Sequence, residues 1–175
     1  MKDDGQTSLL TEAREQLLRD AWLRHDALWF RYTFKHLSED ATNTINIAIV
    51  ERLGECEMLS LVRKLRVKRP KSTDIGAIKR LLETGLVLYQ TQHSPVDIEQ
   101  LPGHRLQVSM HDCWACEAVR KEGMLAQYRC GPWGRLKGWL RALDITPVLL
   151  PDPDYCLALA GGNADSLCQV EVQIL

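Results

Sequence analysis

The sequence predicts an α+β fold, with N-terminal helices packed on a C-terminal, mostly antiparallel sheet that carries two short inserted helices. Apolar residues recur at helical spacing up to about residue 84, and from about residue 86 they alternate with polar residues. Clusters of Pro, Gly and Asp separate the later apolar runs. Helices followed by hairpin-connected strands are typical of this class. We expect a single domain over residues 1–175, with a helical part at about 8–84 and a sheet part at about 86–175.

The composition restricts the expected environment and partners. Of the 175 residues 26% are charged, and the formal net charge is -1, so we expect neither nucleic acid nor an anionic membrane as a partner. The acidic start Met1–Asp4 does not resemble a signal peptide, and the sequence lacks a long uncharged apolar run. We therefore expect a soluble, cytoplasmic protein. In that compartment six cysteines indicate reduced thiols, metal ligands or redox groups more often than disulfides.

Three helices are expected in the first half of the chain. The first should span about Leu9 to His36. The second should begin after the N-cap Ser38 and bend near Gly54. The third should be capped by residues 72–74 and end at Gly85. The apolar face expected on the first helix consists of Leu10, Leu17, Ala21, Leu28 and Tyr32, widened by Trp22, Trp29 and Phe30.

Strands and two short helices are expected in the second half. The short helices should cover Cys113–Lys121, stopped by Gly123, and Pro132–Leu143, where Pro132 suits the first turn. The expected strands are Leu86–Thr91, Val96–Ile98, Arg105–Met110, Thr146–Leu150, Tyr155–Leu159 and Leu167–Gln173. In the last strand, apolar Val170, Val172 and Ile174 should form one face and Gln169, Glu171 and Gln173 the other, as in an antiparallel sheet with one solvated side.

The residues with the greatest chemical potential lie in the stretch from His111 to Gly123. This stretch gathers two thiols, an imidazole and a carboxylate where a strand is expected to enter a helix. Five of the six cysteines follow from Cys113 onward. The clustering indicates a site without revealing its reaction, and three chemistries and one structural explanation remain open.

A metal site is the first hypothesis. Cys113, Cys116 and Cys130 can supply thiolate ligands, with zinc as the candidate ion. A fourth ligand would come from His111, Cys156 or Cys168. The spacing matches a zinc site only in part, because a second CxxC pair is absent.

A thiol redox protein using the Cys113/Cys116 pair is the second hypothesis. A strand that runs into a CxxC motif at a helix start favours the thiolate, because the helix dipole and the free backbone N–H groups stabilise its charge. Asp112 opposes thiolate formation, and the βαβ pattern that should precede such a motif is absent.

A nucleophilic enzyme is the third hypothesis, with Cys113 or Cys130 as the attacking thiol, His111 or His104 as base and Asp112 as orienting group. The structural explanation is that the thiols simply fill the core, as small buried side chains often do. It applies first to the cysteines in apolar stretches, namely Cys56, Cys156 and Cys168.

Further residues can contribute to a binding site. His25 and Asp26, together with Trp29, can line a pocket from the first helix, although aromatic residues at helical spacing are more often part of a core. Trp133 lies at a helix start whose free N–H groups beside Cys130 can receive an anion. Arg120 can hold a ligand carboxylate in bidentate fashion.

The chain resembles a largely uncharacterised prokaryotic family of L-2-amino-thiazoline-4-carboxylic acid hydrolase-like proteins. The residues that carry the resemblance are Trp22, His25–Phe30, Ala41, Asn46, Glu51–Gly54, Asp112–Cys113, Ala118–Gly123, Cys130–Gly134, the turn Pro151–Asp154 and Cys168. The resemblance implies a single α+β domain with a cysteine-lined site to which Cys113, Arg120, Cys130 and Cys168 contribute. Cys116 is an extra thiol relative to the pattern, and residues 146–150 lack a cysteine that the pattern has.

The order of elements also looks like the ligand-binding domains related to vinyl reductase and to the haem-nitric-oxide-associated group, a likeness of fold alone. The leading hypothesis is a small-molecule-binding protein whose pocket lies between helices and sheet. The alternatives are a hydrolase of a small cyclic amide or thiazoline-like substrate, which acts on C–N bonds with Cys113 or Cys130 as nucleophile or metal ligand, and the thiol redox protein. A structural hypothesis has the thiols fill the core while an apolar helix face forms a homodimer.

Overall fold

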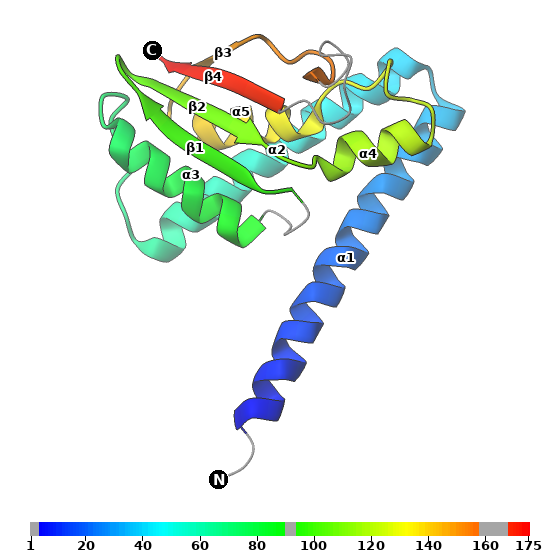
Figure 1. Cartoon of the computed structure of the whole chain (residues 1–175), viewed down its shortest axis with the longest axis horizontal. Helices are drawn as coiled ribbons and strands as arrows, with labels where there is room; N and C mark the ends of the chain where they lie inside the picture. The colour runs from blue at the N-terminus through cyan, green and yellow to red at the C-terminus, as the bar shows by residue number, and fades with distance from the viewer. Residues whose placement is uncertain (1–3, 90–93, 158–167) are drawn as a thin grey trace. The chain divides into compact units, whose positions relative to one another are not determined.

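The computed structural model describes residues 4–89, 94–157 and 168–175, and it confirms the α+β class (Figure 1). The chain divides into two compact units, Met1–Thr42 and Asn43–Leu175. The elements in chain order are α1 (Asp4–His36), α2 (Glu39–Leu65), α3 (Ile75–Tyr89), β1 (Val96–Leu101), β2 (Arg105–Met110), α4 (Trp114–Lys121), α5 (Gly131–Ala142), β3 (Pro147–Leu150) and β4 (Cys168–Ile174).

The sheet of the second unit is antiparallel throughout the described strands, in the order β1-β2-β4-β3. Val108 of β2 lies opposite Val170 of β4. The alternation predicted for the last strand is confirmed: Val170, Val172 and Ile174 are buried, and the residues between them are partly exposed. One face of the sheet therefore belongs to the core.

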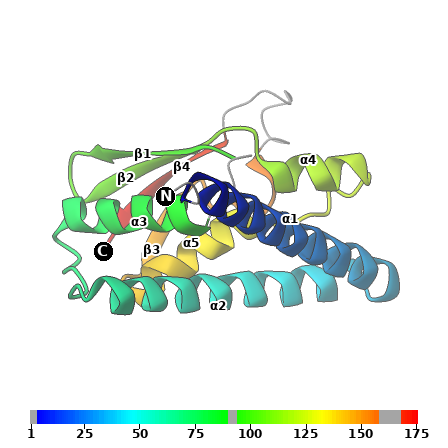
Figure 2. The same cartoon turned by 90° about the horizontal axis from the view of Figure 1, so that it is seen from below.

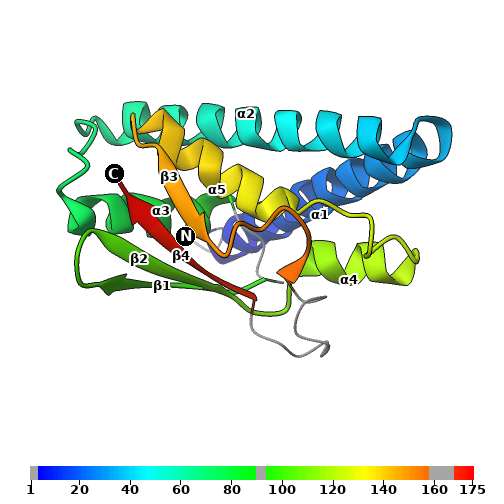
Figure 3. The same cartoon turned by 90° about the horizontal axis from the view of Figure 1, so that it is seen from above.

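Helices α3 and α5 pack on that face, with α3 against β1 and β2 and α5 against β3. Helix α5 runs between α2 and the sheet (Figures 2 and 3). The fully buried large side chains that fill this space are Trp133, Met58, Leu61, Ile78, Leu82, Leu106, Leu140, Leu143, Ile145, Val108, Val170 and Val172. The core thus lies among α2, α3, α5 and one side of the sheet.

Two glycines allow α2 and α5 to cross closely. A Cβ on Gly54 of α2 would overlap the carbonyl oxygen of Arg135 on α5, and a Cβ on Gly138 of α5 would overlap that of Glu51 on α2. Helix α2 continues unbroken through Gly54 (Figure 2), so this glycine provides space for the neighbouring helix.

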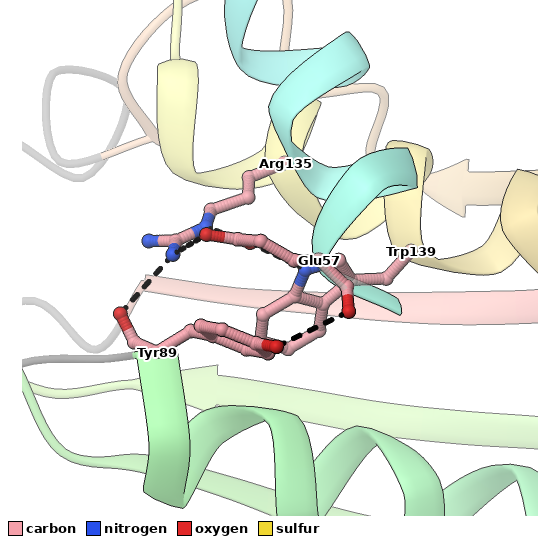
Figure 4. A network of polar contacts seen from close by, with 4 residues as sticks. All are labelled: Glu57, Tyr89, Arg135 and Trp139. Carbon is pink, nitrogen blue, oxygen red and sulfur yellow. Dashed lines mark hydrogen bonds and ion pairs between the residues drawn. The ribbon is translucent and has the colours of Figure 1, made fainter. Parts of the chain in front are cut away.

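Glu57 joins α2 to α5 and lies beside the end of α3. Its carboxylate accepts hydrogen bonds from the Arg135 guanidinium, with 2.7 Å from Nε to Oε2, and from the Trp139 indole at 2.9 Å (Figure 4). Arg135 also donates to the Tyr89 carbonyl at 3.1 Å, and the Tyr89 hydroxyl donates to the Glu57 carbonyl at 3.3 Å. We call Glu57, Tyr89, Arg135 and Trp139 the Glu57 network.

The helix starts at Ser38 and at residues 72–74 are confirmed. The Ser38 hydroxyl accepts a hydrogen bond from the Ala41 N–H at 3.2 Å, and the Asp74 carboxylate accepts one from the Ala77 N–H at 3.0 Å. Both bonds satisfy N–H groups that have no partner within the helix.

The strand predicted at Leu86–Thr91 is wrong for the described residues, because α3 continues to Tyr89. Gly85 does not end the helix. Its missing Cβ allows the Trp139 ring to pack against α3, since an added Cβ would lie 3.3 Å from that ring. The bonds of Tyr89 to Glu57 and Arg135 then hold the last turn, so tertiary contacts override the alternating pattern. Gln90 and Thr91 lie outside the described residues.

The strand predicted at Tyr155–Leu159 is also not formed over its described part. Tyr155 makes an isolated antiparallel bridge with Arg129, and residues 158–159 lie outside the described residues. The prolines and aspartates just before Tyr155 favour a turn, which leaves few residues for a ladder. Leu167, the predicted first residue of the last strand, also lies outside the described residues.

In the first unit, α1 confirms the predicted helix and extends it toward the N-terminus. The face that was predicted as apolar is largely exposed, including Leu17, Trp22, Leu28, Trp29 and Tyr32. Helical periodicity places these residues on a helix surface, but it does not identify what covers them. No helix among the described residues is both long enough and apolar enough to cross a membrane.

Candidate functional site

Five cysteines of the second unit lie near one another. They come from separate segments: the residue before α4, α4 itself, the residue before α5, the segment after the Tyr155 bridge, and the start of β4. These residues are Cys113, Cys116, Cys130, Cys156 and Cys168, and we call them the thiol cluster. All five are free thiols. The remaining thiol, Cys56, is exposed on α2, which corrects its prediction as a core residue.

Helix α4 begins shortly after β2 ends (Figure 1). Two hydrogen bonds of Ser94 fix this connection. The Ser94 hydroxyl accepts a hydrogen bond from the Trp114 N–H at 2.9 Å and donates one to the Asp112 carbonyl at 3.0 Å. Asp112 has φ 48°, a left-handed conformation that turns the chain sharply before Cys113. Cys113 therefore occupies the N-cap position of α4, and Cys116 lies in the first turn.

Helix α5 starts at Cys130, and two residues hold the segment before it. The Asn43 amide of α2 donates to the Gln127 carbonyl at 2.8 Å and accepts from the Arg129 N–H at 3.0 Å. The Tyr128 hydroxyl accepts from the Gly131 N–H at 3.1 Å. These bonds bring the N-cap thiol Cys130 into the core.

Burial dominates the electrostatics of the thiols. It raises the pKa of Cys113, an effect that the N–H groups of Cys116 and Ala115 partly offset. It raises the pKa of Cys130 well above its usual range, and it raises the pKa of Cys168 to about 11. These three sulfurs are therefore protonated thiols near neutral pH, a state with low nucleophilicity.

The Trp133 indole lies beside the Cys168 sulfur and lowers the pKa of that thiol, although burial has the larger, opposite effect. The side chain is only 1% exposed. Within the described part of the chain its Nε1–H has no nitrogen or oxygen acceptor, and the Cys168 sulfur beside it is a weak acceptor. A buried donor that lacks a good acceptor keeps part of its desolvation cost, so this N–H would gain from a stronger acceptor.

Of the other predicted residues, the two histidines proposed as bases lie away from the thiol cluster or pair with another side chain, and Arg120 borders the cluster. The His111 imidazole pairs with the Asp97 carboxylate of β1 at 2.9 Å. His104 lies in the turn between β1 and β2, at the opposite end of β2 from Cys113. Arg120 donates from Nη2 to the Cys116 sulfur at 3.4 Å, so its guanidinium borders the thiol cluster.

His25, Asp26 and Trp29 belong to α1, in the first unit. Their role in ligand binding stays a prediction. Within the helix, the His25 ring stacks on Trp22 with ring centroids 6.0 Å apart and meets Trp29 edge-on at 6.5 Å.

The metal hypothesis for Cys113, Cys116 and Cys130 also stays a prediction. Across residues 4–89, 94–157 and 168–175, the structure has no group of three His, Cys, Asp or Glu side chains arranged to hold a metal ion. The thiols would have to rotate to form such a site, and they would have to lose their protons on binding.

Ser94, Asn43 and Tyr128 position the site, and the sequence analysis did not identify them. Asn43 contacts residues more than 80 positions later in the chain. No local pattern signals a contact over that separation.

Comparison with family models, with curated proteins and with solved structures finds no match for this chain.

We predict that the stability of the fold decreases at alkaline pH. The pKa of the Cys168 thiol is raised from an ordinary 9.0 to about 11, so the protonated form favours the folded state. This stabilisation is complete below about pH 9 and is lost as the pH rises toward 11. Urea unfolding in a pH series should show the free energy of unfolding falling in that window. Cys168→Ala should reduce the fall, and an equally steep fall in this variant would contradict the assignment.

Proposed function

We propose that this chain binds a small molecule at the thiol cluster, against Cys168 and Trp133. The observation that carries the proposal is the buried Trp133 N–H, which has no nitrogen or oxygen acceptor in the described part of the chain and only the sulfur of Cys168, a weak acceptor, beside it. A ligand oxygen or nitrogen at this position would accept that hydrogen bond and remove the cost of the unsatisfied donor. Binding sites combine apolar walls with a few such directed polar groups.

The surroundings favour a ligand that carries a carbonyl or carboxylate. Three of the thiols are neutral near physiological pH because burial raises the pKa of Cys113, Cys130 and Cys168, so they offer soft, weakly polar walls. The Arg120 guanidinium at the edge of the thiol cluster adds a positive charge that attracts a carboxylate. A carboxylate-bearing ligand also agrees with the resemblance to thiazoline-carboxylate hydrolase-like proteins.

The indole N–H signals of ¹⁵N-labelled protein test this proposal. Protein as purified is compared with protein that has been unfolded, desalted and refolded to remove bound molecules. We expect the Trp133 N–H signal, assigned with Trp133→Phe, to move upfield when the ligand hydrogen bond is lost. The Trp139 N–H is the internal control, because its acceptor is Glu57 within the protein. A Trp133 signal that is identical in both samples would contradict the proposal.

The hydrolase alternative requires a reactive thiolate at Cys113 or Cys130. Because burial raises the pKa of both thiols, we predict that iodoacetamide labels Cys113 more slowly than the exposed Cys56 near neutral pH. Quantitative peptide mass spectrometry over a labelling time course measures both rates in one sample. Faster labelling of Cys113 or Cys130 than of Cys56 would favour the hydrolase instead.

We also propose that α1 pairs with α1 of a second copy of this chain. Leu18, Trp22, His25, Trp29, Tyr32 and His36 follow one another at alternating four- and three-residue spacing, the spacing of a two-helix seam. We call these residues the aromatic stripe. Trp22, Trp29 and Tyr32 are 60%, 61% and 59% exposed. Aromatic side chains bury about 150–250 Å² each, so two such stripes approach the roughly 1,000 Å² of a specific interface.

Sedimentation velocity tests this pairing. We expect the wild-type chain to be a dimer at micromolar concentration. The double variant Trp22→Ala/Trp29→Ala should be a monomer that still gives the circular dichroism spectrum of a folded α+β chain. Val87→Ala, at a residue that is 75% exposed on α3, is the matched control and should remain dimeric. A monomeric wild-type chain would exclude the dimer.

A further inference from the structure

Two buried cysteines that are 40 residues apart in sequence meet within the thiol cluster. The Cys156 thiol donates to the Cys116 sulfur, with the two sulfur atoms 3.3 Å apart. Their side chains are 5% and 6% exposed. Cys116 is held in the first turn of α4, and Cys156 directly follows the bridge between Tyr155 and Arg129. Two separately fixed segments therefore bring this pair together.

The geometry distinguishes the two sulfurs. The Cys116 sulfur accepts from Cys156 on one side and from the Arg120 guanidinium, at 3.4 Å, on another. The geometry assigns the attacking role to Cys116, whose sulfur accepts from both neighbours, and the bond-closing role to Cys156, whose sulfur is the donor of the pair.

We propose that Cys116 and Cys156 form a reversible disulfide when the protein meets a hydroperoxide. The Cys116 thiolate attacks one peroxide oxygen, the O–O bond breaks, and the released hydroxide takes up the proton that Cys116 lost, which gives water and a sulfenic acid at Cys116. The Cys156 sulfur then attacks the Cys116 sulfur. The S–O bond breaks, and the departing hydroxide leaves as water with the Cys156 proton. Two thiols and one hydrogen peroxide thus give one disulfide and two waters.

The movement that this step requires is small. A disulfide has an S–S distance of about 2.05 Å, so the sulfurs must approach by little more than about 1 Å. The bond would tie α4 to the segment at Tyr155 and close a loop of 40 residues. Such a link is expected to raise the unfolding temperature by roughly 5–10 °C. The inference does not depend on the proposed ligand, since it uses the contact of Cys116 with Cys156 and Arg120.

Peptide mapping of the wild-type chain tests the proposal without any substitution. Reduced protein is treated with a small excess of hydrogen peroxide, its remaining thiols are blocked under denaturing conditions, and it is digested with trypsin. Cleavage after Arg105 and Arg120 places Cys113 and Cys116 on one peptide, and cleavage after Arg141 places Cys156 and Cys168 on another. We expect a cross-link between these two peptides that disappears with dithiothreitol.

Variants then identify the two cysteines in the cross-link. Cys113→Ser and Cys168→Ser should keep the cross-link, and Cys116→Ser and Cys156→Ser should lose it. A disulfide within the 106–120 peptide would instead assign the reaction to Cys113 and Cys116 and overturn the proposal. Absence of any cross-link in wild-type protein, or its survival in Cys156→Ser, would overturn it equally.

Discussion

Gly138→Ala is expected to destabilise the fold by about 3 kcal/mol, at the upper end of what overpacking of a core costs. The new methyl group would overlap the Glu51 carbonyl and lie 3.1 Å from the Glu55 nitrogen, and both groups are backbone of α2. Because backbone within a helix cannot move aside locally, α2 and α5 would have to separate. Chemical denaturation monitored by circular dichroism measures the loss.

Gly76→Ala is the matched control. A Cβ at Gly76 in α3 would contact the flexible end of Arg80 at 3.4 Å, so alanine fits there. Because alanine is favoured over glycine in helices by up to about 1 kcal/mol, this variant should be as stable as wild type or more stable. Equal stability of the Gly138→Ala and Gly76→Ala variants would show that α2 and α5 do not cross as closely as described.

Glu57→Ala is expected to cost about 3 kcal/mol, because it leaves a partly buried guanidinium and an indole N–H without their acceptor. The Glu57 side chain is 11% exposed and that of Arg135 is 30% exposed, so water compensates only in part. Trp139 would lose its bond to Glu57, and the Arg135 guanidinium, 5.7 Å above the Trp139 ring, would keep only the Tyr89 carbonyl as a hydrogen-bond acceptor within the Glu57 network.

Glu83→Ala removes a carboxylate from a more exposed pair and serves as the comparison. Lys79 and Glu83 pair along α3 with side chains that are 27% and 42% exposed. Pairs of this kind contribute under about 1 kcal/mol. Urea titrations of both variants should therefore differ by about 2 kcal/mol. If Glu57→Ala costs no more than Glu83→Ala, the Glu57 network does not hold the three helices together.

Sequence patterns predicted the elements whose signals are local. The caps at Ser38 and Asp74, the strand Arg105–Met110 and the alternation of the last strand depend on neighbouring residues, and the structure confirms them. The continuation of α3 past Gly85 depends instead on packing against Trp139, which lies more than 50 positions after Gly85 in sequence. Gly85 therefore resembles a helix stop in sequence but serves as a packing surface.

The thiol cluster was predictable only in part, because its cysteines are visible in the sequence but their contacts join distant segments. The sequence indicates a concentration of cysteines, and the structure brings Cys113, Cys130 and Cys168 close together. The partner of Cys116 could not be inferred, because spacing favours Cys113 while the fold brings Cys156 to it. The buried Trp133 N–H without a nitrogen or oxygen acceptor and the raised pKa of the buried Cys168 thiol depend on burial, which no spacing in the sequence reveals.

The most direct test of ligand binding at the thiol cluster is the mass of the intact chain before and after denaturation. The protein is purified under reducing, chelator-free conditions and measured by native and then by denaturing mass spectrometry. We predict a native mass that exceeds the mass of the protein chains in it by one organic molecule per chain, which is lost on denaturation and is absent from Trp133→Phe but present in Cys56→Ala. An excess that corresponds to a metal ion would instead support the metal hypothesis, and a native mass equal to that of the protein chains alone would contradict the proposed function.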